Sequence, residues 1–421
     1  KCMAYFNIHF IILILLHGGR IMFKEFDETL SFETNILEAG AYFRLSTSNP
    51  EALPIHLTTA HNVEDLEDLQ KRYDEKGFCY NRNRNPNRTA LIELMNYVEG
   101  GEDSIGCSSG MAAISSSIIA HTKAGDHILS DKTLYGETLE IFTKILQKYG
   151  VETTFVDFTN IEEVKKNIKS NTVILYTETV SNPLIGVPNL KVLANIAHSN
   201  NAIFIVDNTF MTGALVQPLK FGADIVVNSL TKFANGHSDV VCGAATGKSE
   251  LIKKIYELQV LLGTQSDPFS SWLTVRGMRT LELRIKKQCE NASALALELE
   301  KSPYVLKVNH PSLVNNPYHN LAHEQFGDYY GGMLSIELPE DLKKINKFMR
   351  TLKLAHYAMT LGGYRTSFAY PVMSSHSDMT RDERLAIGIT DGLLRISVGI
   401  ENIKDLINDF KNALEVAYGN K

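Results

Sequence analysis

Lys232 follows an apolar run and sits among hydroxyl-bearing residues. Residues 225–227 predict a buried strand, and Ser229, Thr231 and then a glycine-containing turn follow it. A lysine in this position is poorly placed to be a solvated surface charge. Burial lowers the pKa of an amine and makes it nucleophilic, so Lys232 is predicted to form a Schiff base with an aldehyde.

Asp207 closes a second apolar run, residues 202–206, a short way upstream of Lys232. This run also predicts a buried strand. A carboxylate at its end could hold a pyridinium nitrogen protonated, so that the ring acts as an electron sink. The two segments together indicate covalent chemistry on an aldehyde cofactor.

These segments resemble those of the pyridoxal-phosphate enzymes of cysteine and methionine metabolism, the transsulfuration family of lyases and synthases. The resemblance runs over roughly residues 34–416, and its other segments keep the family's order. They are residues 80–86, 109–113, 134–136, 178–183, 272–280 and 393–399. The lysine motif alone is moderately specific, whereas the ordered set is strongly specific.

The resemblance implies an aspartate-aminotransferase-like α/β fold, with a mainly parallel sheet in a large domain and a smaller α+β C-terminal domain. It also implies pyridoxal 5'-phosphate as the cofactor and a small sulfur-containing amino acid as the substrate. The hydrophobic pattern agrees, because strands and helices alternate as in a parallel sheet covered on both faces. Strands are predicted at 127–130, 151–156, 173–177 and 202–206, and helices at 89–99, 110–121, 161–168 and 190–200.

A chain of 421 residues exceeds what one hydrophobic core usually supports. Residues 1–21 are interpreted as a non-native or upstream segment, although their apolar run leaves an export signal as an alternative. The other predicted parts are an extended N-terminal arm (22–82), a cofactor-binding large domain (83–280) and a C-terminal domain (281–421). A long helix over 276–300 is predicted to bridge the two domains. Further helices are expected at 342–352 and 402–418, and strands at 333–338 and 393–398.

Composition excludes several classes of function. The net charge of −6, with 44% hydrophobic and 21% charged residues, is that of an ordinary globular protein without a basic face for nucleic acid. The five cysteines are scattered and form no Cys-x-x-Cys pair, which argues against a zinc site and fits a reducing cytoplasm. The apolar run 10–16 is too short to cross a membrane. No metal, nucleic acid or membrane partner is expected.

Ser109 precedes a helix that begins with small residues, including Gly110 and Met111. Free backbone N–H groups at such a start can bind an anion, although small residues also serve tight helix packing. The resemblance implies that the cofactor phosphate lies on Gly110 and Met111. The hydroxyls of Ser229 and Thr231, on one side of the strand end, are predicted to donate to the same phosphate rather than to cap the turn.

The resemblance also implies roles around the cofactor ring and the substrate. Tyr135 is expected to stack on the ring and to transfer protons, and Thr209 to contact the cofactor. Asn182 is expected near the phenolic oxygen of the cofactor and the substrate carboxylate, which Arg395 would clamp. Without the resemblance, Tyr135 could be a core residue, Asn182 a turn residue and Arg395 half of a structural salt bridge.

Tyr80 and Arg82 lie at the end of the predicted arm. The resemblance implies that this pair reaches the phosphate site of a neighbouring subunit, where a guanidinium suits a dianion. A solvated arginine cluster is the alternative. If the implied role holds, the protein is at minimum a homodimer, and a homotetramer is expected.

Several positions depart from the family pattern and leave the substrate open. Thr360 replaces the usual serine, Glu137 stands where glycine or cysteine is common, and His56 replaces a tyrosine. Met359 occupies a position that is often acidic in enzymes that handle cystathionine. Because Met359 and Thr360 are expected beside the substrate, an apolar side chain there favours the short thioether tail of methionine or homocysteine.

The predicted activity is therefore elimination of the γ-substituent of a sulfur amino acid, of the methionine or cystathionine γ-lyase type, giving a 2-oxo acid, ammonia and a thiol. Alternatives with the same residues are γ-replacement, as by cystathionine γ-synthase or O-acylhomoserine sulfhydrylase, and cystathionine β-lyase activity. A nucleotide-binding oxidoreductase is disfavoured because no G-x-G-x-x-G follows the first strand. A non-catalytic homologue is disfavoured by the complete residue set.

Overall fold

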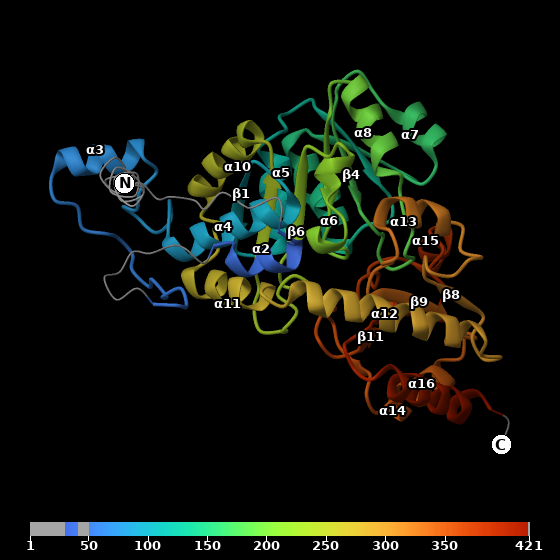
Figure 1. The fold of residues 1–421 in the computed structure, drawn as a ribbon. Coiled ribbons are helices and arrows are strands. Elements are labelled where there is room, and N and C mark those ends of the chain that lie inside the picture. Colours follow the sequence, from blue (N-terminus) through green and yellow to red (C-terminus); the bar gives the residue numbers. More distant parts are fainter. Residues whose placement is uncertain (1–29, 41–49, 420–421) are drawn as a thin grey trace, which may run out of the picture.

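The computed structural model describes residues 30–40 and 50–419. The interpretation of residues 1–21, and the parts of the predicted arm at 22–29 and 41–49, lie outside this range. The described chain contains a seven-stranded and a five-stranded sheet, each with its own helices and hydrophobic core (Figure 1). The predicted α/β fold with a smaller α+β C-terminal part is confirmed. The exact domain boundaries stay a prediction.

The seven-stranded sheet has the order β1-β7-β6-β5-β4-β2-β3. The five strands from β6 to β3 are parallel, while β7 runs antiparallel to both of its neighbours. The strands are β1 (Asp103–Cys107), β2 (His127–Asp131), β3 (Glu152–Val156), β4 (Thr172–Glu178), β5 (Ile203–Asp207), β6 (Ile225–Ser229) and β7 (Gly243–Gly247). The sequence prediction missed β1 and β7, because neither segment is a continuous run of large apolar residues.

Helices cover both faces of this sheet, which explains why its central strands are apolar throughout. Ile205 of β5 belongs to a core with α5 and α10, whereas Phe204 and Val206 belong to a second core with α7 and α8. Alternate residues of one strand thus face opposite layers. The helices are α4 (Pro86–Glu99), α5 (Gly110–Ile119), α7 (Ile161–Asn167), α8 (Leu190–Ser199) and α10 (Ser249–Leu262).

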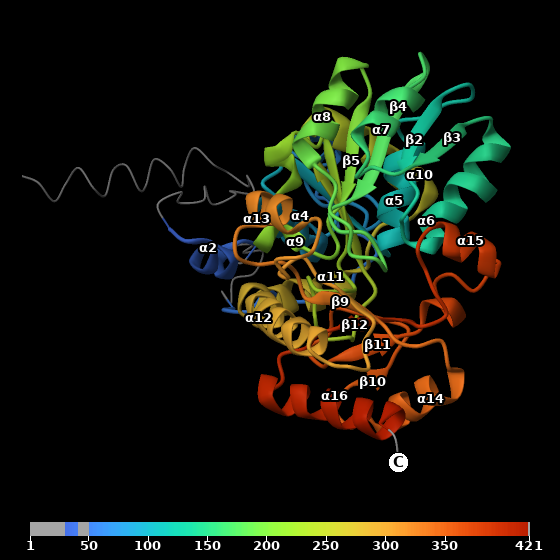
Figure 2. The same cartoon turned by 90° about the vertical axis from the view of Figure 1, so that its right-hand side faces the viewer.

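The five-stranded sheet has the order β10-β11-β12-β9-β8 and packs on helices α14 and α16 (Figure 2). Phe348 of α14 and Phe410 of α16 are buried in this core together with Ile396 of β12. The elements are α12 (Leu281–Glu300), β8 (Lys307–Asn309), β9 (Met333–Glu337), α14 (Leu342–Thr351), β10 (His356–Tyr357), β11 (Ser367–Ala369), β12 (Leu393–Ser397) and α16 (Ile403–Tyr418).

The single helix predicted over 276–300 is wrong. The structure has α11 (Pro268–Met278) and α12, separated at Arg279 and Thr280. The guanidinium of Arg279 donates to the carbonyl oxygens of Ile36 and Ala39, the latter at 2.6 Å. Arg279 thus ties the helix break to the N-terminal segment, a contact between distant residues that no local pattern reveals.

The prediction of a wholly extended arm is also wrong. The arm contains α2 (Phe32–Glu38) and α3 (Leu66–Asp74), and α3 stands apart from the sheets in Figure 1. Asp65 caps α3 by accepting a hydrogen bond from the backbone N–H of Asp68 at 2.7 Å, and Asp68 pairs with Arg72. Leu66, Leu69 and Tyr73 recur at helical spacing along α3, although α3 buries none of its residues, so the sequence carried a helical signal that the prediction missed.

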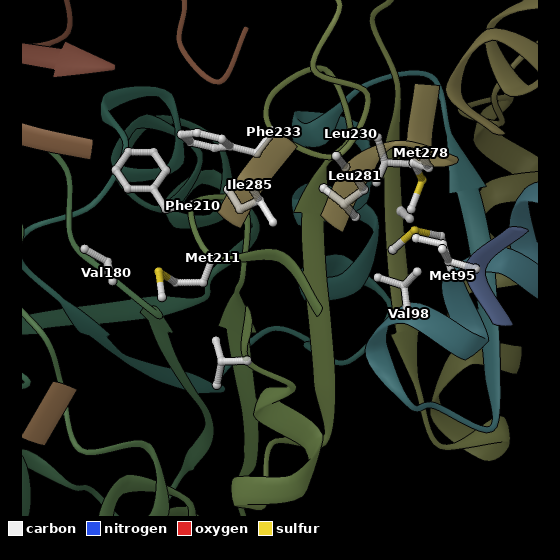
Figure 3. Close-up of a cluster of buried hydrophobic side chains, with 14 of the residues drawn as sticks. Met95, Val98, Val180, Phe210, Met211, Leu230, Phe233, Met278, Leu281 and Ile285 are labelled. Atoms are coloured by element: carbon white, nitrogen blue, oxygen red, sulfur yellow. The ribbon is translucent and has the colours of Figure 1, made fainter. Parts of the chain in front are cut away.

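One hydrophobic cluster fixes the chain around Lys232 (Figure 3). Leu230 and Phe233, on either side of the lysine, are fully buried in it. They pack with residues of α4, α11, α12 and the loop after β5, among them Met95, Phe210, Met278 and Leu281. The lysine backbone is therefore anchored on both sides by side chains that exclude water.

The loop at Gly362 packs directly on this segment. Gly362 has a φ of +78°, and a Cβ there would lie 2.4 Å from Phe233 N and 2.7 Å from Lys232 C. Gly362→Ala is therefore expected to lower the thermal unfolding midpoint by several degrees, since both strain and a backbone clash destabilise the fold. Gly125→Ala is the matched control, because Gly125 also has a positive φ (+90°) but open space around it. Equal shifts in the two variants would contradict the steric argument.

Candidate active site

A cavity of about 310 Å³ opens where the carboxyl ends of β4, β5 and β6 meet the five-stranded sheet. All but two of the predicted site residues line it: Gly110, Met111, Tyr135, Asn182, Asp207, Thr209, Ser229, Thr231, Lys232, Met359, Thr360 and Arg395. Carboxyl ends of parallel strands are where open α/β sheets bind ligands. A larger cavity of about 770 Å³, beside α4 and α10, contains none of the predicted residues.

Lys232 projects its amine toward the C-terminal part of the chain. Its Nζ donates to Thr360 Oγ1 at 3.3 Å. Burial lowers the pKa of Lys232, and the positive charge of Arg395 lowers it further. The lowered pKa is in the direction that the sequence prediction requires, and the role of Lys232 as the amine that binds an aldehyde stays a prediction.

Asp207 is the last residue of β5 and is only 8% exposed. Burial raises the pKa of Asp207 to about 6, against hydrogen bonds from Thr209 that lower it. The backbone N–H of Thr209 donates to Asp207 Oδ1 at 2.9 Å, and Thr209 Oγ1 accepts from Ser229 N at 2.8 Å. Thr209 therefore links the carboxylate to the strand that leads to Lys232.

Two buried acids support this arrangement and were given no role from the sequence. Glu178 pairs with Asp207 in the β4–β5 register and accepts from Tyr135 N at 2.7 Å. Burial and the neighbouring Asp207 raise the pKa of Glu178 well above its usual range. A carboxylate closing the apolar run 173–177 repeats the pattern of Asp207, and that repetition could have indicated it.

Glu99, at the end of α4, is the second acid. It accepts from Asn208 Nδ2 at 3.1 Å and Asn228 Nδ2 at 2.9 Å, the side chains next to Asp207 and Ser229. Burial raises the pKa of Glu99 to about 7. Glu99 thus connects the ends of β5 and β6 from behind the cavity. No local sequence signal distinguishes it from an exposed helical glutamate.

The N-terminus of α5 forms an anion site at the cavity wall. Ser109 Oγ accepts from Ala112 N at 3.0 Å, which leaves the N–H groups of Gly110 and Met111 without partners inside the helix. A Cβ on Gly110 would lie 2.6 Å from Ser229 Cβ, so only glycine allows this close approach to β6. Thr231 is oriented differently from the prediction, because its hydroxyl donates to Cys242 O at 3.2 Å. Donation to a phosphate would require that hydroxyl to rotate.

Arg395, in the middle of β12, is 8% exposed. Its Nη1 donates to Asn182 Oδ1 at 3.1 Å. Within residues 30–40 and 50–419 no carboxylate forms an ion pair with it, so the salt-bridge alternative is not observed. Burial lowers the pKa of Arg395 to about 10, and the guanidinium still carries its charge near neutrality. A buried cation without an acidic partner favours an anionic ligand.

Tyr135 and Met359 lie at the rim. Tyr135 is 36% exposed, and burial together with Glu137 raises its pKa to about 12. Met359 is 67% exposed, because only one side of it meets the cavity. A side chain this exposed offers little apolar burial, which weakens the predicted preference for a short thioether tail.

Tyr80 and Arg82 are absent from this cavity. The Arg82 guanidinium lies 5.6 Å from the ring centre of Tyr80, and its Nη1 donates to Val260 O at 3.3 Å. The expectation that Tyr80 and Arg82 reach the phosphate site of a neighbouring subunit stays a prediction. His56 also lies elsewhere, and its backbone N–H donates to Asn87 Oδ1 at 2.8 Å.

The donor set fits pyridoxal 5'-phosphate. Lys232 can bind the aldehyde, Asp207 can hold the ring nitrogen protonated, and the α5 N-terminus can bind the phosphate. A Cβ at position 110 would clash with Ser229 and prevent the N-terminus of α5 from lying this close to the end of β6, where the phosphate would bind. Fold and site together define an α/β enzyme of the pyridoxal-phosphate class.

Comparison with known proteins agrees with this class. The profile of the family described as Cys/Met metabolism PLP-dependent enzyme matches residues 33–415. An L-methionine gamma-lyase from Fusobacterium nucleatum subsp. nucleatum is 41% identical over 86% of this chain and 93% of its own. A cystathionine gamma-lyase from Bacillus subtilis is 42% identical over 80% and 89%. The crystal structure of cystathionine gamma synthase from Xanthomonas oryzae pv. oryzae with cystathionine superimposes with a TM-score of 0.87, at 33% identity over 92% and 98%.

The chain belongs to the pyridoxal-phosphate-dependent enzymes of cysteine and methionine metabolism. The predicted family, cofactor and fold are thereby confirmed. None of the helices in the described residues has the length and apolarity needed to cross a membrane.

Lys232→Ala is expected to abolish the visible absorption of the cofactor-bound protein and its turnover, because the amine that binds the aldehyde is removed. Absorption spectra before and after borohydride reduction measure this. Lys191→Ala, at an exposed lysine on α8, is the control and should keep both properties. A Lys232→Ala protein with a borohydride-reducible chromophore and normal turnover would refute the assignment.

Proposed function

We propose that this enzyme eliminates the γ-substituent of a sulfur amino acid, of the methionine or cystathionine γ-lyase type, and releases a 2-oxo acid, ammonia and a thiol. The observation that carries the proposal is the convergence of Lys232 and Arg395 on Thr360. Lys232 Nζ lies 3.3 Å from Thr360 Oγ1, and Arg395 Nη2 lies 3.5 Å from Thr360 O. Lys232, which can transfer protons, thus lies close to Arg395, which can bind the carboxylate of a substrate.

The proposed roles follow from these positions. The cofactor supplies an electron sink for charge that develops at Cα. Arg395 and Asn182 bind the substrate α-carboxylate and orient Cα toward Lys232. Lys232 takes the proton from Cα and returns protons during the later steps, which its lowered pKa favours.

Tyr135 is proposed as the acid for the leaving group. Its pKa of about 12 keeps the phenol protonated at neutral pH, so it can donate a proton to the departing sulfur. Glu178 fixes the Tyr135 backbone at the cavity rim through the hydrogen bond to its N–H. The hydrogen bonds from Thr209 favour the ionised form of Asp207, against the burial that raises its pKa.

Elimination is preferred over replacement because the lyase relatives resemble this chain more closely than the synthase structure does. γ-Replacement and cystathionine β-lyase activity would use the same side chains, so they are outcomes of the assay below. We also propose a cytoplasmic location, in which the buried thiols of Cys107, Cys242 and Cys289 stay reduced.

The deciding assay supplies methionine, homocysteine, cystathionine and O-acetylhomoserine separately, with and without sulfide or cysteine. We expect 2-oxobutanoate, ammonia and a thiol from the γ-substituted thioethers without an added nucleophile. Pyruvate and homocysteine from cystathionine would indicate β-lyase activity. Thioether formed only in the presence of a thiol would identify a synthase and reject the first proposal.

We further propose that the protein is a homodimer at minimum, and a homotetramer in its complete form, with Tyr80 and Arg82 serving the neighbouring site. Their exposure on the surface, outside the cavity of their own chain, supports this. Mixing inactive Arg82→Ala and Lys232→Ala subunits should restore about a quarter of the sites, since half of the random dimers contain one intact site. If subunit exchange is demonstrated and turnover stays at zero, both residues act within one chain.

A further inference from the structure

Glu137 is a carboxylate at the opening of the cavity that the proposed chemistry does not use. It lies in the first turn of α6 (Gly136–Glu140), lines the cavity and is exposed. Its backbone is held from two sides. Tyr135 N donates to Glu178, and a Cβ on Gly136 would lie 2.6 Å from Ser375 O. The carboxylate is therefore presented at a fixed part of the rim.

The other charges of the cavity have partners or assigned tasks. Asp207 and Glu178 are buried and accept backbone hydrogen bonds, while Lys232 and Arg395 face the reacting end of the substrate. Glu137 forms no ion pair within the described ranges 30–40 and 50–419. The Tyr135 phenol is its polar neighbour, and the negative charge of Glu137 also raises the pKa of Lys232. By contrast, Glu140 in the same helix is paired with Lys144.

We propose that Glu137 is a specificity-determining residue that binds a cationic group at the far end of the substrate, such as the distal ammonium of cystathionine. This inference rests on the proposed γ-elimination. Met359, at the same rim, carries no charge for such a group, so Glu137 supplies the carboxylate from a different element. A charged carboxylate beside low-dielectric walls attracts a cation more strongly than one on an open surface. A methyl thioether gains nothing from it.

The test compares Glu137→Gln with the wild type and with Glu140→Gln, a substitution in the same helix whose charge faces away from the cavity. For cystathionine, kcat/KM of Glu137→Gln should fall about tenfold, mainly through KM, because an ion pair is lost. For methionine, kcat/KM of Glu137→Gln should fall less, because only the contact of Glu137 with the Tyr135 phenol is lost, and Glu140→Gln should resemble the wild type for both substrates. That loss is common to both substrates, so the ratio of the two kcat/KM values reports the ion pair alone. An unchanged ratio overturns the proposal, since Glu137 would then act only through Tyr135.

Ionic strength gives a second readout that needs no variant. Salt should raise the wild-type KM for cystathionine more than that for methionine, because the contact with the exposed Glu137 is screened more strongly than the contact of either α-carboxylate with the buried Arg395. An equal effect of salt on the two KM values overturns the proposal even if Glu137→Gln fails to fold. The failure of γ-elimination is recognised separately, by the absence of 2-oxobutanoate from every substrate. In that case the inhibition constants of cystathionine and methionine replace KM, and the same ratio decides the role of Glu137.

Discussion

The burial of an amine at the end of β6 is the constraint on which the rest of the site depends. Leu230 and Phe233 lie on either side of Lys232 and are fully buried, so the chain cannot turn the lysine toward solvent without opening the core. Desolvation then makes the amine less basic. The nucleophile is thus a product of hydrophobic packing, and the hydroxyl of Thr360 gives the buried amine one polar contact.

The structure also places carboxyl groups at the ends of β5 and β4, the strands that follow β6 in the sheet. Asp207 and Glu178 end adjacent parallel strands, and each accepts a backbone N–H. Glu99 accepts from the amides beside the ends of β5 and β6. Burial raises the pKa of all three groups and so disfavours their ionised forms, while the hydrogen bonds that they accept oppose this effect.

Local pattern was sufficient for the central parallel strands β4, β5 and β6, because they are mostly buried and read as continuous apolar runs. Lys232 and Asp207 could be picked out from the sequence because each lies just after one of these apolar runs.

Local sequence pattern failed where an element is determined by contacts with distant residues or by polar groups. The break at Arg279 depends on the carbonyl groups of Ile36 and Ala39, and the small residues of β7 form no run of large apolar side chains. The direction of the Thr231 hydroxyl is set by Cys242, which pairs with it across a turn. The roles of Glu178 and Glu99 likewise could not be predicted, because they depend on which residues of neighbouring elements lie opposite them.

The interior of the cavity holds buried charges, whereas its rim consists of exposed side chains. In the interior, Arg395 and Lys232 are cations close enough that one lowers the pKa of the other, and neither forms an ion pair with a carboxylate of the described chain. An incoming α-carboxylate relieves that repulsion, so substrate binding and the charge balance of the interior favour each other. At the rim, Glu137 and Met359 are exposed, although the charge of Glu137 still reaches Tyr135 and Lys232 and raises the pKa of both. An uncharged rim side chain such as Met359 can change without altering the buried charges, so that part of the rim can set which leaving group is accepted while the interior keeps the same chemistry.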